Sequence, residues 1–123
     1  MKELINSAKS MRDGLKAEHD RLQKVFKAET DVNKMDALDT QISQIGKDIV
    51  ALESKVLYLE VAAKKSSFAP SRLGPLAKSM SDHSRETSRV IKEHSDSVEQ
   101  AKYLALRVAT GAKLVGDVLK TIA

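Results

Sequence analysis

The sequence predicts an all-α fold, an antiparallel helical hairpin of coiled-coil type, and three observations lead to this prediction. Apolar residues recur at spacings of three and four along most of the 123 residues. Both prolines, Pro70 and Pro75, stand between two long stretches of this pattern. Aromatic residues make up only 3% of the chain and tryptophan is absent, which suits helix–helix seams of Leu, Ile, Val and Ala better than a compact globule.

The strongest signal is an unbroken alternation of three- and four-residue steps before the prolines. This spacing is the seam of a coiled coil, and it is sustained for more than three heptads. The residues between the apolar positions are mainly Asp, Gln, Ser, Lys and Glu, as expected for an exposed face. The seam consists of Leu38, Ile42, Ile45, Ile49, Leu52, Val56 and Leu59.

A weaker seam of the same spacing comes first, one residue out of phase with the next. The slip falls at 30–34, where Thr30, Asp31 and Asn33 can each cap a helix. We therefore expect a helix over 2–65, either continuous or broken at 30–34, and a break would give three helices. Without a break, roughly the first fifteen residues would overhang the hairpin and pair with another molecule.

The segment 66–74 is predicted to be a turn. Pro70 disfavours a helical conformation for the residue before it, and Gly74 with Pro75 resembles an N-cap followed by a first helical residue. A helix is expected over 75–122, where the apolar spacing returns. Small residues in this second helix face large ones in the first, which favours antiparallel pairing within one helical domain of residues 1–123.

Oligomerisation is expected because a two-helix hairpin buries only one face of each helix. Further apolar residues lie off the seam, among them Val50, Leu57, Tyr58 and Val61. A third helix or a second chain would cover them. The residues predicted for the inter-chain face are Leu104, Val108, Val115 and Leu119.

Several classes of chemistry find no support in the sequence. The chain has no cysteine, which excludes disulfides, cysteine-ligated metals and cysteine nucleophiles. The three histidines, His19, His83 and His94, match no metal-ligand spacing, and His94 reads as a polar seam position. Neither a phosphate-binding loop nor a nucleophile elbow is present. We expect no enzymatic activity, no cofactor, no metal and no small-molecule substrate.

Positive charge is concentrated in the second half of the chain, which carries the whole net charge of +4. Around the turn, Lys78, Arg85, Arg89 and Lys92 form a basic stripe that could bind the phosphates of a nucleic acid. The alternative interpretation is a solvated face at the tip of the hairpin, since no nucleic-acid recognition motif accompanies the stripe.

The C-terminal segment 101–122 is amphipathic, with Lys102, Lys113 and Lys120 opposite an apolar arc. Such a helix can lie on an anionic membrane surface. Gly111 and Gly116 favour close helix packing instead, because glycine inside a helix costs about 1 kcal/mol. No apolar run reaches membrane-spanning length and no signal peptide is visible, so a cytoplasmic protein is expected, or a component of a virion or a secreted assembly.

Taken together, these patterns predict a non-enzymatic structural or assembly protein: a scaffold, structural subunit or adaptor acting through helical self-association. Its expected partners are copies of itself or another helical protein. The alternatives are a nucleic-acid-binding accessory protein that uses the basic tip, and a peripheral membrane protein that uses its amphipathic helix.

Overall fold

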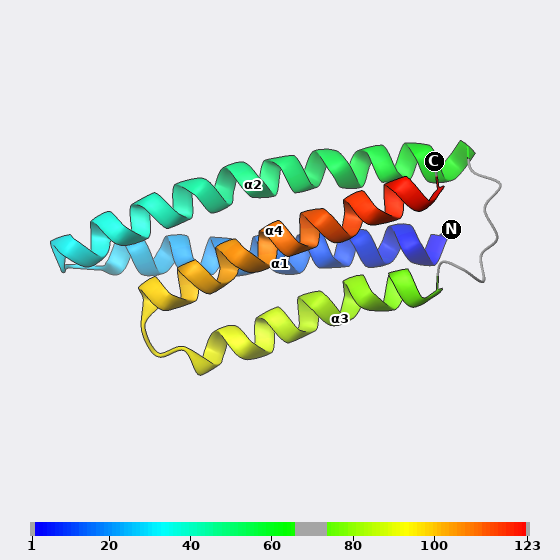
Figure 1. Cartoon of the computed structure of the whole chain (residues 1–123). Coiled ribbons are helices and arrows are strands. Elements are labelled where there is room, and N and C mark those ends of the chain that lie inside the picture. The colour runs from blue at the N-terminus through cyan, green and yellow to red at the C-terminus, as the bar shows by residue number, and fades with distance from the viewer. Residues whose placement is uncertain (1, 66–73, 123) are drawn as a thin grey trace.

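The computed structural model describes residues 2–65 and 74–122, and all regular structure in this part of the chain is helical, which confirms the all-α prediction. The elements are α1 (Lys2–Ala28), α2 (Val32–Lys65), α3 (Gly74–Val90), the 3₁₀ turn η2 (Ile91–Glu93) and α4 (Ser97–Ile122). Figure 1 shows that α1 and α3 run in one direction and α2 and α4 in the other.

The first break in the helical pattern lies where the phase slip predicted it, between Ala28 and Val32. Asp31 begins α2, because its Oδ1 accepts hydrogen bonds from the backbone N–H groups of Asn33 (2.9 Å) and Lys34 (3.2 Å). These bonds satisfy amides that have no partner inside the helix. The chain therefore reverses at 29–31, and α1 folds back along α2.

A second break was not expected. The helix predicted over 75–122 is in fact divided at 94–96 into α3 with η2 and α4. Asp96 caps α4 as Asp31 caps α2, with its Oδ1 accepting the N–H of Val98 at 3.1 Å. Among the described residues the chain thus forms four α-helices, and the prediction of one long second helix is wrong.

The predicted turn at 66–74 lies almost entirely outside the described residues, as do Pro70 and Arg72. Gly74 and Pro75, expected as N-cap and first helical residue, are the first two residues of α3.

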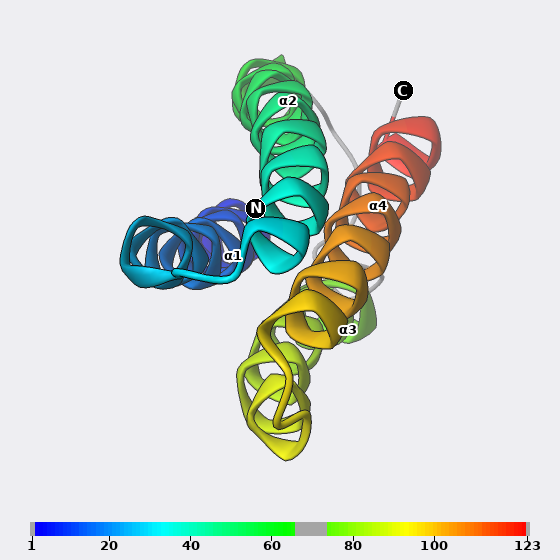
Figure 2. The ribbon, with the colours of Figure 1, turned by 90° about the vertical axis from the view of Figure 1, so that its left-hand side faces the viewer.

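The four helices form two antiparallel pairs that lie side by side (Figures 1 and 2). The most extensive packing is of α2 on α4 and of α1 on α3. α1 also packs along α2 and, less extensively, on α4, and α3 contacts α4 least. α2 and α3 do not meet within the described residues, and the end view shows them on opposite sides of the bundle. One apolar core runs through all four helices.

The residues expected to overhang a hairpin are instead part of this core. α1 contributes a buried row over its whole length, each side chain at most 1% exposed: Leu4, Ala8, Met11, Leu15 and Leu22. Gly111 explains how α4 comes so close to this row. A Cβ atom at Gly111 would lie only 3.2 Å from Leu15 Cδ1 and 3.5 Å from Met11 Sδ, so the absent side chain leaves room for α1.

Candidate interaction surface

The predicted seam of α2 faces the core. Its seven members are at most 6% exposed: Leu38, Ile42, Ile45, Ile49, Leu52, Val56 and Leu59. Because α1 and α4 both pack against α2, the seam has partners within the same chain.

The predicted inter-chain face has to be corrected. Leu104, Val108 and Val115 are completely buried, and Leu119 is partly buried against the same core. The prediction assumed a two-helix hairpin that leaves one side of the last helix open. In the structure the neighbouring helices cover that side, so these residues are not available to a second chain. The same packing places the apolar arc of α4 inside the bundle.

The predicted anion-binding residues lie exposed on α3 and η2, but two of them are partnered along the chain. Arg85 pairs with Asp82 at 2.6 Å, and Arg89 pairs with Glu93 at 3.2 Å. Lys78 and Lys92 are exposed on the same two elements. The ion pairs reduce the charge that this stripe offers to a phosphate.

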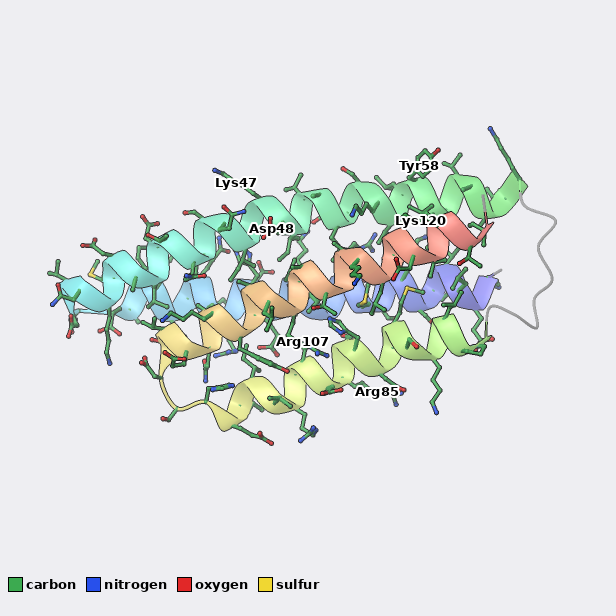
Figure 3. The ribbon with its side chains drawn as sticks, in the orientation of Figure 1. Lys47, Asp48, Tyr58, Arg85, Arg107 and Lys120 are labelled. Carbon is green, nitrogen blue, oxygen red and sulfur yellow. The ribbon has the colours of Figure 1, made fainter. Side chains whose placement is uncertain are left out.

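The most unusual surface feature lies on α2, on the side opposite the core. Val50, Leu57, Tyr58 and Val61 are 63%, 58%, 67% and 53% exposed. In Figure 3 the labelled Tyr58 and Lys47 both point away from the other helices. Single exposed apolar residues are common on proteins, whereas a contiguous group on one helix face is a candidate interaction surface.

These side chains belong to a second seam with the same spacing as the buried one. Steps of three and four residues connect its members, which we call the outer seam: Lys47, Val50, Ser54, Leu57, Val61 and Lys64. Tyr58 lies beside it. Several of these residues are visible in the sequence as apolar positions off the main seam, but their own periodicity was not part of the prediction.

The α1 side of the outer seam carries acidic residues that already have partners. Glu53 pairs with Lys16 at 3.5 Å, and Glu60 pairs with Lys9 at 3.1 Å. These bridges also connect α2 to α1. They leave little net charge on this flank.

The α4 side is basic. A groove of about 350 Å³ between α2 and α4 is lined by Lys55, Lys113 and Lys120, with Asp117 as the acidic residue. None of the ion pairs formed by the described residues involves these three lysines. The floor is formed by small residues, and the Nζ atom of Lys55 lies 3.9 Å from where a Cβ of Gly116 would be.

A buried polar network ties α3 to α4. The Nε2–H of His83 donates to the Arg107 carbonyl at 2.8 Å. Arg107 in turn donates from Nε to Thr87 Oγ1 at 2.8 Å and from Nη2 to the His83 carbonyl at 3.1 Å. Burial lowers the pKa of His83, although the bond to the Arg107 carbonyl partly opposes this. The network holds α3 and α4 together.

His19 plays a similar part between α1 and α2, where its Nε2–H donates to the Ile42 carbonyl at 3.0 Å. His94, predicted as a seam residue, lies instead in the 94–96 break, with its ring 5.3 Å from that of Tyr103. Within residues 2–65 and 74–122, no cluster of three or more His, Asp or Glu side chains is placed to hold a metal ion.

None of the described helices is both long and apolar enough to cross a membrane. Comparison with protein-family models, with curated proteins and with solved structures finds no match for this chain.

Proposed function

We propose that this chain is a non-enzymatic assembly protein, a scaffold, structural subunit or adaptor, that acts by binding a helix along the outer seam of α2. The observation that supports the proposal is the line of exposed apolar side chains at Val50, Leu57 and Val61, with Tyr58 beside it. Spacings of three and four are those by which one helix receives the side chains of another.

The opposite face of α2 packs in the core, so the helix that carries the outer seam is held rigidly. Little conformational entropy is then lost when a partner binds, which favours association. Burying the exposed parts of four such side chains contributes about 4–8 kcal/mol. That gain is comparable with the cost of association, so the seam supports moderate affinity, and its flanks help to choose the partner.

The partner is either a second copy of the chain or a helix of another protein. Light scattering on a sizing column, joined to small-angle X-ray scattering, tests the first. Binding of a synthetic amphipathic helical peptide with apolar residues at 3-4 spacing tests the second.

The decisive variant is Leu57→Glu, which places a charge in the middle of the outer seam and should abolish either form of association. Leu106→Glu is the matched control, because Leu106 is an equally exposed leucine (66%) on α4. Association that survives Leu57→Glu, or a wild-type chain that binds neither itself nor the peptide, would refute the proposal.

A further inference from the structure

We infer that the outer seam binds an acidic amphipathic helix from another protein, one whose apolar stripe is bounded by Asp or Glu residues. The inference rests on the proposed function and names the partner class for the same surface. Two features of the molecule lead to it: a correspondence between the two helix pairs and the charges around the seam.

The two helix pairs share several features at a separation of 65 positions. The caps Asp31 and Asp96 are related by this shift, and so are the first residues of α2 and α4, Val32 and Ser97.

Both pairs also contain the same histidine contact. His19 bonds to the carbonyl of Ile42, and its ring lies 3.6 Å from where a Cβ of Gly46 would be. His83 bonds to the carbonyl of Arg107, and its ring is likewise 3.6 Å from the Cβ position of Gly111. The acceptors and the glycines are again 65 residues apart and the histidines 64, so the α1–α2 and α3–α4 pairs correspond at these points.

The same shift of 65 residues relates the outer seam of α2 to a covered part of α4. Val50, Ser54 and Leu57 correspond to Val115, Leu119 and Ile122 of α4. Val115 is fully buried, and the other two are partly buried against the core. On α4 these positions pack inside the bundle, where α2 is the main neighbour of α4. The corresponding positions on α2 are therefore the ones that no helix of the bundle covers. Stacked helix pairs expose such a face at the end of a stack, and a helix is the element that fits it.

Charge then selects the kind of helix. Lys47 and Lys64 stand at the two ends of the outer seam, about 25 Å apart along α2 at 1.5 Å per residue. The groove on the α4 flank adds three more lysines, Lys55, Lys113 and Lys120, against one acidic residue in its lining, Asp117. Asp48, on the same side of α2, accepts a hydrogen bond from Gln44 Nε2 at 3.0 Å. A partner with acidic residues at both ends of its apolar stripe and along one flank matches this pattern.

A second copy of the chain matches it poorly. If two α2 helices paired in parallel, Lys47 would face Lys47 and Lys64 would face Lys64. If they paired antiparallel about a two-fold axis, the lysine flanks of both copies would lie on the same side of the interface. Both arrangements place like charges together, which weakens association.

The test uses three synthetic peptides of about 25 residues, long enough as a helix to span the seam. They share one set of apolar residues at 3-4 spacing and carry Glu, Gln or Lys at every flanking position. Binding to the full chain is measured by fluorescence anisotropy. The Glu peptide should bind roughly tenfold more tightly than the Gln peptide, as several exposed ion pairs predict, and the Lys peptide most weakly. The differences should shrink at high salt.

Charge reversal at the groove should invert the order of the peptides. The variant carries Glu at Lys55, Lys113 and Lys120. A control with the same net charge carries Glu at three exposed lysines on other surfaces, Lys24, Lys34 and Lys92. Circular dichroism confirms that both variants keep their helices. An inversion in the groove variant alone supports the inference.

The outcomes separate the two proposals. If Leu57→Glu abolishes binding but the three peptides bind equally, or if the control variant shifts the preference as much as the groove variant, the acidic partner is refuted and helix binding by the seam stands. A wild-type chain that dimerises through the seam and binds no peptide likewise refutes the acidic partner and leaves helix binding by the seam in place. Peptide binding that survives Leu57→Glu refutes both.

Discussion

The contact between Gly111 of α4 and Leu15 of α1 provides a direct test of the four-helix arrangement. In Gly111→Ala, the gain in helix propensity is about 1 kcal/mol. The new methyl group would lie 3.2 Å from Leu15 Cδ1, so the leucine must move by a few tenths of an ångström. The two effects oppose each other, and we expect the free energy of unfolding to change by less than about 1 kcal/mol.

The effect of Gly111→Ala on the free energy of unfolding should be different in a protein that also carries Leu15→Ala. Leu15 is completely buried, so its truncation alone should cost about 2–5 kcal/mol. In its absence the methyl group of Gly111→Ala meets no crowding and fills part of the cavity. The substitution at 111 should then stabilise the protein by clearly more than it does in the wild type, with a coupling energy of about 1 kcal/mol.

Urea denaturation followed by circular dichroism gives all four free energies of the cycle. Gly46→Ala is the control, because its methyl group would approach only the ring of His19, at 3.6 Å. It should gain close to the full 1 kcal/mol or so of helix propensity in both backgrounds. If Gly111→Ala and Leu15→Ala are additive within about 0.5 kcal/mol, α1 does not pack on α4 at this point and the arrangement is wrong.

Three further predictions follow from particular residues. Because burial lowers the pKa of His83, its contribution to stability is complete above the ordinary value of 6.5 and is lost as the pH falls through and below it. His83→Gln should reduce the change of the urea midpoint with pH between about pH 7.5 and about pH 5. An unchanged pH dependence of the midpoint would contradict this. Asp96→Ala should cost about 1 kcal/mol through loss of the α4 cap, and a change below a few tenths would show that the cap is dispensable. If the stripe on α3 binds nucleic acid, Arg85→Ala with Arg89→Ala should weaken binding at low salt; no wild-type binding there would remove that alternative.

Local signals account for what could be predicted from the sequence. The seam of α2 was visible because its apolar spacing is a property of one helix. The first reversal was visible because a phase slip coincides with residues that cap helices, and Asp31 does cap α2. Both features depend on residues close together in the chain.

The second reversal was missed because the apolar spacing continues through it without a slip. Ile91, His94 and Val98 maintain steps of three and four across the break, although only the first of them is fully buried. The available signal was Asp96 followed three residues later by Glu99, a pattern that resembles a capping box. The missed reversal also led to the wrong inter-chain face, because a single long helix would have left Leu104 and Val108 uncovered.

The two seams of α2 have the same spacing, so periodicity cannot decide which of them faces the core. Packing against α1 and α4 decides it, and this depends on how distant segments meet. The internal correspondence was hidden for a related reason. At a shift of 65 residues few identities remain, among them Asp31 with Asp96 and Gly46 with Gly111. The aspartates begin helices, and at both glycines a histidine ring lies at an ordinary contact distance, 3.6 Å from the Cβ position. Core side chains can exchange for others of similar volume, which hides a correspondence of this kind from a search for identical residues.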